Sequence, residues 1–252
     1  MLREDTVFGP IKSRRLGKSL GINLLPTKGK VCNFDCIYCE CGLNSEGRGD
    51  TTLPTAARVR SALEDKLMQL MLDGAHIDSI TFSGDGEPTL NPEFPRIVDD
   101  TLLLRDAFFP SAKVTVLSNA TRAVIPEIFA ALRKVDNPIL KLDAPTDGLA
   151  YLINRPSEGY SVAETVEALS RFEGDFILQT MFLRAPGIGF DSGSPEVLGP
   201  WMDIVRCLKP RQIQVYSIDR PTPEKGIEKY GPEELKTLVK PLLDEGFNVH
   251  IR

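Results

Sequence analysis

No apolar run in this chain of 252 residues approaches the roughly 20 residues that a membrane-spanning helix requires. The stretch from Met1 to Gly21 is charged from its third residue onward and contains no apolar segment of signal-peptide length. These two absences predict a cytoplasmic protein.

An excess of basic side chains is also missing. The chain has 30 Lys and Arg against 35 Asp and Glu, which gives a formal net charge of -5. A strongly basic balance would have favoured nucleic acid or an anionic membrane surface as the partner. A local basic patch is still compatible with this composition, so nucleic acid stays an open partner class that the charge does not support.

Histidine is scarce, since His76 and His250 are the only two. Cysteine occurs five times, and four of the five lie between Cys32 and Cys41. In a reducing compartment such clustering favours metal binding or catalysis over a disulfide framework. The fifth, Cys207, falls in the helical run IVRCLKP, and we expect it to be buried in the core.

Strand and helix patterns alternate along the chain. Predicted strands cover residues 21–25, 79–83, 113–118, 139–142, 176–183, 212–217 and 248–251. Predicted helices cover residues 55–72, 94–108, 125–135, 162–172, 195–208 and 232–247. This alternation implies βαβ crossovers and a parallel sheet in an α/β fold. About six such units favour a partial (β/α)6 TIM-like barrel over a full eight-fold one, and a doubly wound open sheet is the alternative.

Neither a composition shift nor a low-complexity stretch marks a second domain. We therefore predict a single domain over residues 1–252, with residues 1–20 as an N-terminal extension. The Pro- and Gly-rich segment 185–194 is predicted to be a long loop after a strand, a place where loops often cover active sites.

Three of the clustered cysteines, Cys32, Cys36 and Cys39, follow the spacing C-x3-C-x2-C. Thiolates are soft ligands that suit iron–sulfur clusters, zinc or copper(I). A zinc-stapled binding module is one alternative, although the second pair of ligands that such sites commonly use is missing. A four-cysteine iron–sulfur electron-transfer protein is another, if Cys41 or Cys207 completes the set. The more economical interpretation is a three-cysteine loop that leaves one iron open to a ligand, with Cys41 as a thiol that does not ligate.

The spacing follows the first predicted strand, has an aromatic residue before its last cysteine, and is followed by GDGEP after the second strand. In these respects the chain resembles the radical S-adenosylmethionine (SAM) superfamily. The resemblance extends along FGPIKSRRLGKSLGINLLP, CNFDCIYCECG, FSGDGEPTLNPEF, KLDAP, INRPS and VYSIDRPTPE to stand-alone Fe-S oxidoreductases related to the wyosine tRNA-base synthases. The wyosine enzymes carry further cysteines for a second cluster. This chain has no second cysteine cluster, which argues against wyosine synthesis itself.

The resemblance implies a [4Fe–4S] cluster on Cys32, Cys36 and Cys39, with SAM chelating the fourth iron through its amine and carboxylate. It implies reductive cleavage of SAM to methionine and a 5′-deoxyadenosyl radical that abstracts hydrogen from a substrate. A flavodoxin or ferredoxin is the expected electron donor. The substrate stays open among a tRNA base, a peptide or protein and a small metabolite, and no residue is assigned to the chemistry on it.

The resemblance also implies a SAM-binding turn at GDGEP. Gly84, Asp85, Gly86 and Glu87 correspond to a GGEP motif in which backbone groups approach the methionyl amine, so small residues are favoured there. An ordinary turn between a strand and a helix is the alternative.

Other predicted SAM contacts lie at the ends of later strands. Lys141 and Asp143 are two residues apart on one strand, so both side chains point to one face. Because a buried charge needs a partner, we expect them to face the barrel interior and a ligand; a mutual or solvent-facing ion pair is the alternative. The remaining expected contacts are Tyr38, Ser118, Asn119, Gln179 and Tyr216, and for Ser118 and Asn119 a helix N-cap is an equal alternative.

Overall fold

The computed structural model describes residues 5–13, 15–27, 29–46 and 51–252. The chain divides into two compact units, each built from several segments. The first unit comprises Met1–Cys32, Asn44–Ser118 and Ile125–Pro138, and the second comprises Asn33–Leu43, Asn119–Val124 and Ile139–Arg252. The single domain over residues 1–252 stays a prediction, and the periodicity did not indicate this internal division.

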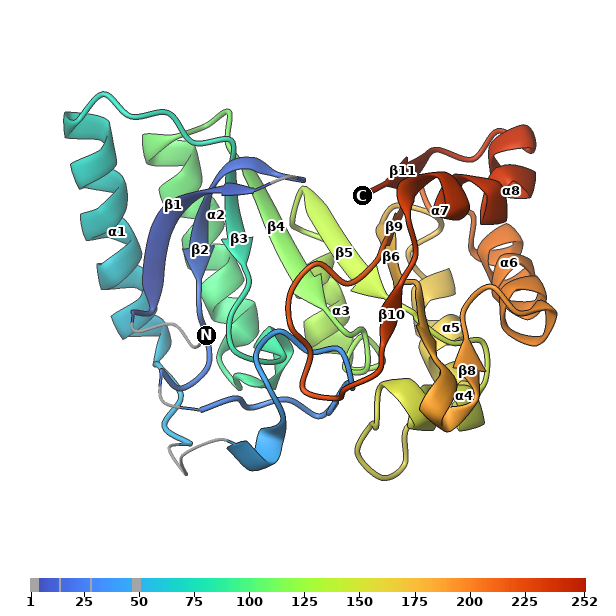
Figure 1. The fold of residues 1–252 in the computed structure, drawn as a ribbon. Helices are drawn as coiled ribbons and strands as arrows, with labels where there is room; N and C mark the ends of the chain where they lie inside the picture. The colour runs from blue at the N-terminus through green and yellow to red at the C-terminus, as the bar shows by residue number, and fades with distance from the viewer. Residues whose placement is uncertain (1–4, 14, 28, 47–50) are drawn as a thin grey trace. The chain divides into compact units, whose positions relative to one another are not determined.

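The first unit consists of a β-sheet with α-helices running alongside its strands (Figure 1). Its strands follow in the order β1 (Val7–Ser13), β2 (Gly17–Ile22), β3 (Ser79–Phe82) and β4 (Lys113–Ser118). Strands β2, β3 and β4 are parallel, and β1 runs antiparallel to β2. The helices are α1 (Ala56–Leu72), α2 (Phe94–Phe108) and α3 (Pro126–Leu132), with short 3₁₀ turns η1 (Asn44–Glu46) and η2 (Pro88–Leu90).

Alternation along these strands separates an apolar face from a polar one. In β3, Ile80 and Phe82 are fully buried, and the Phe82 ring meets the ring of Phe94 at the start of α2 edge to face. The apolar side chains therefore lie on the helix-covered face, as is usual for a parallel sheet. Ser79 and Thr81 alternate with them and lie on the opposite face.

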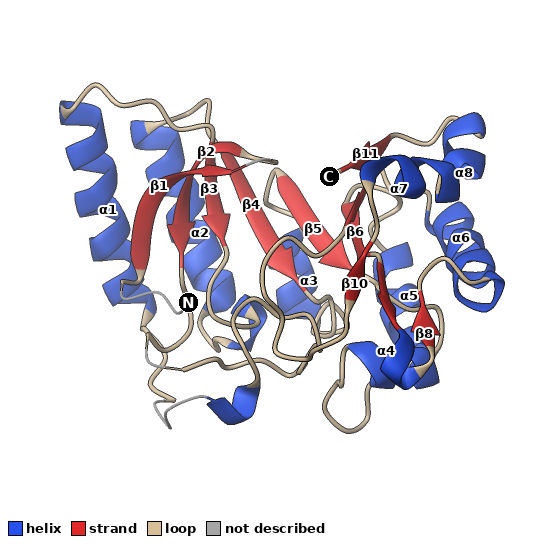
Figure 2. Cartoon of the chain, in the orientation of Figure 1, coloured by secondary structure: helices blue, strands red, loops and turns tan. Residues whose placement is uncertain are grey.

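The second unit repeats the parallel strand and helix pattern. Its sheet contains β5 (Asn137–Lys141) from Ile139 onward, then β6 (Ile177–Met181), β9 (Gln212–Tyr216) and β11 (Val249–Ile251), all parallel. Its helices are α4 (Asp147–Ile153), α5 (Val162–Ser170), α6 (Pro195–Leu208), α7 (Pro232–Leu238) and α8 (Lys240–Asp244), coloured blue in Figure 2.

Helix α6 overturns one expectation. Its buried residues include Val197, Trp201, Val205 and Leu208, which recur at helical spacing on one face. Cys207 is exposed, so the expectation that it lies in the core is wrong. Adjacent residues are about 100° apart around a helix, which places Cys207 outside the face that Leu208 buries.

The expected loop 185–194 is more structured than predicted. It contains the 3₁₀ turn η3 (Pro186–Ile188) and β8 (Phe190–Asp191), and β8 joins β7 (Leu183–Ala185) and β10 (Glu228–Lys229) in a small antiparallel sheet. Strands of two or three residues have too little periodicity to be recognised in the sequence.

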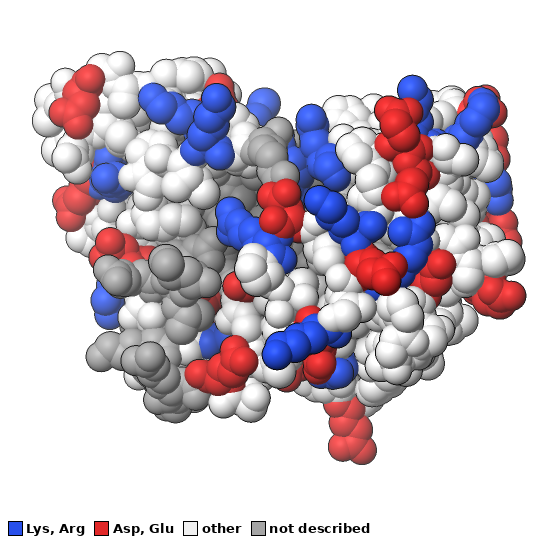
Figure 3. Space-filling model, in the orientation of Figure 1, with Lys and Arg blue, Asp and Glu red and all other residues white. Residues whose placement is uncertain are grey.

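Charged side chains of both signs intermix on the face drawn in Figure 3. Among the described residues, many charged side chains form ion pairs, such as those of Arg206 with Asp203 at 2.8 Å and with Glu245 at 2.7 Å. Within the described ranges, no helix has both the length and the apolar character needed to cross a membrane.

Candidate functional site

The predicted cluster ligands lie in one continuous stretch of chain that both units share. Cys32 closes a segment of the first unit, whereas Cys36 and Cys39 belong to the second. Cys36 is buried, and Cys32 and Cys39 are partly exposed. Among the described residues, no group of three or more Cys, His, Asp or Glu side chains is placed to hold a metal ion. The grouping of the three cysteines around one cluster therefore stays a prediction.

Backbone hydrogen bonds hold the cysteine segment of the second unit against the residues that follow α4. The Asp35 N–H donates to the Asn154 carbonyl at 2.9 Å, and the Ile37 N–H donates to the Ile153 carbonyl at 3.0 Å. The Cys39 N–H donates to the Cys36 carbonyl at 3.1 Å, which folds the segment into a turn. The position of Cys36 is thus set by a neighbouring backbone segment far along the chain.

A buried polar network surrounds Cys36, and Asp143 is its centre. The Asp143 side chain is only 1% exposed. Its Oδ1 accepts from the Met181 N–H at 2.8 Å, and its Oδ2 accepts from Asn154 Nδ2 at 2.7 Å and from the Tyr38 hydroxyl. A buried carboxylate is tolerated because donors of the chain itself satisfy it.

Lys141 extends this network. Its Nζ lies 2.7 Å from the Tyr216 hydroxyl, 3.5 Å from Asp143 Oδ2 and 4.7 Å from the centre of the Tyr38 ring. Burial acts to lower the pKa of Lys141, but Asp143, Tyr216 and Cys36 together raise it by more, so the net pKa is raised. Four of the predicted SAM-contacting side chains, Tyr38, Lys141, Asp143 and Tyr216, are therefore brought together within the second unit.

The thiol of Cys36 itself is shifted by the same surroundings. Burial raises its pKa, while the nearby charge of Lys141 and the hydrogen bond from Asn154 act in the opposite direction. Because metal ligation requires the thiolate, binding of a metal would have to release this proton.

Gln179 and Asn119, two further predicted contacts, each meet another amide side chain. Gln179 Nε2 lies 3.4 Å from Gln214 Oε1 on the adjacent strand β9, and both glutamines are buried. Asn119 Nδ2 donates to Asn33 Oδ1 at 2.7 Å, which links it to the residue that follows Cys32.

The GDGEP turn lies in the first unit, where it pairs with the backbone just before Cys32. Val31 and Gly86 form an isolated parallel bridge. The Val31 N–H donates to the Asp85 carbonyl at 3.0 Å, and the Glu87 N–H donates to the Val31 carbonyl at 3.1 Å. The turn is thereby tied to the start of the cysteine motif.

The two glycines of this turn are required by contacts within the protein. A Cβ on Gly84 would lie 2.0 Å from Asn23 Oδ1, and a Cβ on Gly86 would lie 1.8 Å from the Val31 carbonyl oxygen. Gly86 also has a φ of 141°, which L side chains rarely adopt. The sequence interpretation attributed these small residues to the approach of SAM, whereas the structure gives the close approach of the chain to itself as a sufficient reason.

Glu87 and Ser118, both predicted to contact SAM, are bonded to each other. Glu87 Oε1 accepts from the Ser118 hydroxyl at 2.8 Å, the Thr89 hydroxyl at 2.6 Å and the Thr89 N–H at 3.1 Å. Glu87 is 2% exposed and caps η2. Its carboxylate therefore organises the turn from within.

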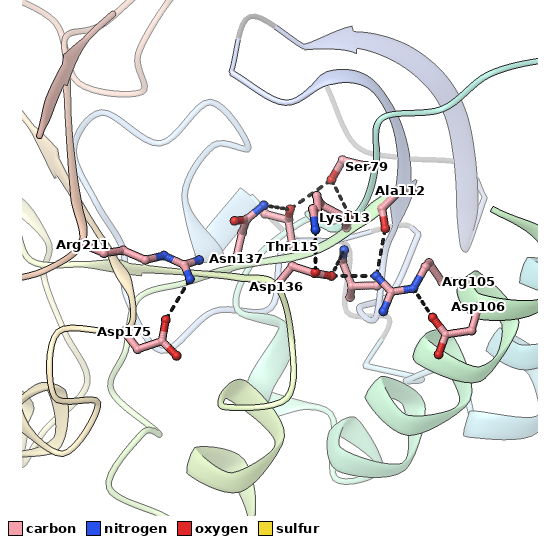
Figure 4. Close-up of polar contacts among 11 residues, drawn as sticks. Ser79, Arg105, Asp106, Ala112, Lys113, Thr115, Asp136, Asn137, Asp175 and Arg211 are labelled. Carbon is pink, nitrogen blue, oxygen red and sulfur yellow. Dashed lines mark hydrogen bonds and ion pairs between the residues drawn. The ribbon is translucent and has the colours of Figure 1, made fainter. Parts of the chain in front are cut away.

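A row of buried hydroxyls lies on the polar face of the first unit's strands. Ser79 Oγ lies 3.0 Å from both Thr81 Oγ1 and Thr115 Oγ1, and Ser19 Oγ lies 2.7 Å from Thr81 Oγ1. Figure 4 shows Ser79 bonded to Thr115 and to the backbone of Lys113, with Asn137 donating to Thr115. We call Ser19, Ser79, Thr81 and Thr115 the hydroxyl row.

Sequence reasoning missed Asn154, which belongs to the polar network, and Gln214, which accepts from Gln179. Asn154 stands in the segment INRPS, which carried part of the family resemblance, so that motif was the available signal. Gln214 alternates with the apolar residues Ile213 and Val215 on β9, and this alternation was the corresponding signal for its face.

A family model described as the Radical SAM superfamily matches residues 27–181, which is more than half of the chain. A Brachyspira hyodysenteriae protein named GTPase Obg is 29% identical over 243 residues, which cover 95% of this chain and 34% of that protein. A UPF0026 protein of Helicobacter pylori is 27% identical over 233 residues, which cover 91% of this chain and 71% of its own length. The chain thus spans about a third of the first relative and most of the second.

Solved structures show the fold. A radical SAM methyltransferase from Sphaerobacter thermophilus superposes with a TM-score of 0.69 at 18% identity, covering 93% of this chain and 65% of that one. TYW1 with a lysine–pyruvate adduct superposes with a TM-score of 0.62 at 15% identity, covering 91% of this chain and 74% of that one. The expected α/β partial barrel is confirmed by these likenesses. The structural support for the wyosine-related part of the resemblance is distant, because TYW1 is 15% identical to this chain.

Proposed function

Because the chain belongs to the radical SAM superfamily and is a radical SAM enzyme, we propose that Cys32, Cys36 and Cys39 hold its [4Fe–4S] cluster. The spacing C-x3-C-x2-C inside the matched segment 27–181 carries this proposal. Three thiolates suit the cluster chemically, and they leave one iron to SAM. When bound, the cluster and SAM supply a reductively generated 5′-deoxyadenosyl radical that takes hydrogen from the substrate.

We assign SAM contacts in each unit separately. In the first unit, Gly84, Asp85 and Gly86 offer backbone groups to the methionyl amine, while the Glu87–Ser118 pair keeps the turn in shape. Support comes from the bonds that Glu87 accepts from Thr89 and Ser118, which fix the turn before any ligand binds.

In the second unit, Lys141 and Tyr216 are the proposed contacts to the carboxylate or ribose of SAM. Asp143 is already satisfied by three donors, so we assign it the role of holding Lys141 and Tyr38 rather than meeting SAM directly. Gln179 and Asn119 complete the proposed set through their amides.

Radical SAM enzymes need an electron donor. We propose that a flavodoxin or ferredoxin fills this role here. We also propose that the radical abstracts hydrogen from a substrate of one of three classes: a tRNA base, a peptide or protein, or a small metabolite. Nucleic acid is the class that the net charge of -5 supports least.

The test begins with anaerobic reconstitution of the chain and of single cysteine variants. Wild-type protein should bind about four irons per chain, as one cubane requires. Cys32→Ala, Cys36→Ala and Cys39→Ala should each abolish binding, and Cys41→Ala, the matched control, should retain it. Stoichiometric zinc, or loss of the cluster in Cys41→Ala, would contradict the proposal in favour of a zinc module or a four-cysteine electron carrier.

The second stage follows SAM. Reduced, cluster-loaded protein should release methionine and 5′-deoxyadenosine slowly without substrate, measured by chromatography. Addition of a tRNA pool, a peptide library or a metabolite extract should accelerate release only for the class that contains the substrate. Intact SAM after prolonged reduction would end the assignment of SAM as the second cofactor.

A further inference from the structure

The side-chain amide of Asn154 lies against the sulfur of Cys36. Asn154 Nδ2 is 3.4 Å from Cys36 Sγ, and this distance suits an N–H···S hydrogen bond. Asn154 is 2% exposed, so water does not compete for the donor. Nothing in the cysteine spacing indicates this contact, because the two residues are far apart in sequence.

Backbone and side-chain bonds together fix the amide in this place. The Asn154 N–H donates to the Ala150 carbonyl at 2.7 Å at the end of α4, and its carbonyl accepts from the Asp35 N–H at 2.9 Å. On the side chain, Nδ2 also lies 2.7 Å from Asp143 Oδ2 and 2.7 Å from the Tyr38 hydroxyl. The amide is therefore held by α4, by the cysteine segment and by the residue Asp143, which follows β5, before any metal arrives.

The Asn154 amide carries two hydrogens for these three acceptors, so at least one hydrogen is shared. A thiolate accepts more strongly than a thiol, because it carries the negative charge. Loss of the Cys36 proton on metal binding therefore strengthens the bond from Asn154. The other polar groups of the network, Lys141 and Asp143, carry opposite charges that offset each other.

We propose that Asn154 is a positioning residue that acts through Cys36 and raises the reduction potential of the cluster. This inference rests on the proposed function, in which Cys36 is a cluster ligand. An added electron increases the negative charge on the cluster sulfurs, so an N–H donor stabilises the reduced cluster more than the oxidised one. In a buried, low-dielectric position the difference is larger than at a surface.

The experiment compares wild-type protein with Asn154→Leu, which has nearly the same shape but no N–H donor. Both are reconstituted anaerobically without SAM, assayed for iron, and titrated with dithionite while EPR follows the reduced cluster. At a fixed solution potential the ratio of reduced to oxidised cluster should fall about tenfold, equivalent to about 59 mV for a one-electron couple. The matched control is Asn248→Leu, which removes an exposed amide that donates to the Arg211 carbonyl, and it should leave the potential unchanged.

The outcomes are distinct. Full iron content with an unchanged potential in Asn154→Leu would overturn the inference and leave the proposed function standing. Wild-type protein that binds no iron would overturn both.

If Asn154→Leu fails to retain a cluster, a measurement on wild-type protein tests the inference instead. Asparagine labelled with ¹⁵N at the side-chain amide is incorporated, and pulsed EPR of the reduced cluster is recorded. A ¹⁵N hyperfine coupling is expected from a donor at hydrogen-bond distance from a ligand sulfur, and its absence overturns the inference.

Discussion

Gly86 combines a φ of 141° with a position where an added Cβ would lie 1.8 Å from the Val31 carbonyl oxygen. A side chain there is strained by the backbone conformation and also collides with backbone, which cannot move aside as a flexible side chain does. We expect Gly86→Ala to destabilise the apoprotein by roughly 2 to 4 kcal/mol, measured by chemical unfolding followed by circular dichroism.

Gly148 provides the matched control, because an added Cβ meets nothing within 4 Å there and the residue lies in α4. Gly148→Ala should be neutral or stabilising, since alanine favours helix. Equal stability of Gly86→Ala and wild type would show that the turn tolerates a side chain. The approach of SAM would then again be the explanation for the glycines of this turn.

Individual site residues were predictable where a motif places them, and not where tertiary pairing does. Lys141 and Asp143 were expected on one face as residues two apart on a strand. Strand β5 ends at Lys141, but the two side chains still lie 3.5 Å apart and contact Tyr216 and Tyr38 in the second unit. Asn154 was missed because its place beside Cys36 depends on backbone bonds from Asp35 and Ile37 across a long stretch of chain. Local sequence carries no signal of that pairing.

At the scale of elements, the segment 218–227 between β9 and β10 crosses the cysteine segment, and we call it the strap (Figure 1). The Glu224 N–H lies 3.3 Å from the Ile37 carbonyl oxygen. Arg220 pairs with Glu40 at 2.8 Å, and Arg155 pairs with Glu224 at 2.7 Å. Both pairs are solvent-exposed, so salt screens them and each contributes about 1 kcal/mol or less.

If Cys36 and Cys39 hold a cluster, opening of the strap should expose it to oxygen. We expect the double variant Arg155→Gln, Arg220→Gln to lose its cluster absorbance in air about two- to fivefold faster than wild type, as about 0.5 to 1 kcal/mol of weakened closure implies. High salt should accelerate wild type similarly and the double variant little.

Arg206→Gln is the control for this prediction, because Arg206 on α6 forms comparable exposed pairs with Asp203 on the same helix and with Glu245 at the end of α8. It should leave the rate of bleaching unchanged. Equal rates for the double variant and wild type would mean that the strap does not protect the cluster.

Long periodic elements were predicted well and short ones were not. The helices α2 and α6 and the strand β4 begin and end at the residues that the sequence pattern predicted. Strand β1 was missed because Gly9 and Pro10 interrupt it, and β8 and β10 are only two residues long. The predicted helix 232–247 is divided into α7 and α8, with Pro241 near the start of the second.

For the whole molecule, the balance of charge bears on the substrate class. The net charge is -5, and both signs intermix on the face drawn in Figure 3, so that face offers a polynucleotide few phosphate contacts that would release counterions. We expect tRNA to bind with a Kd weaker than about 10 μM at physiological salt, measured by gel shift on apoprotein and on cluster-loaded protein. Tight binding that weakens steeply with salt would contradict this expectation and would favour a tRNA base as the substrate.

The hydroxyl row of the first unit also fixes where its protons lie. Ser79 has one hydrogen and donates it to the Lys113 carbonyl at 2.9 Å, so Thr81 and Thr115 must both donate to Ser79. The hydrogen of Thr81 is then used, and Ser19 must donate to Thr81. The Lys113 carbonyl therefore fixes the donor-to-acceptor direction of every hydrogen bond in the row, and these bonds all lead toward Ser79.

This direction makes two similar deletions unequal. Ser79→Ala leaves the hydroxyl hydrogens of Thr81 and Thr115 without their acceptor, and we expect it to cost roughly 2 to 4 kcal/mol of unfolding free energy. Ser19→Ala removes only the donor at the far end and should cost about 1 kcal/mol. Equal losses of unfolding free energy in the two variants would mean that the hydrogen bonds of the row have no fixed direction. A neutron map would show the same order directly. The deuterons of Thr81 and Thr115 should point to Ser79, that of Ser19 to Thr81, and that of Ser79 to the Lys113 carbonyl.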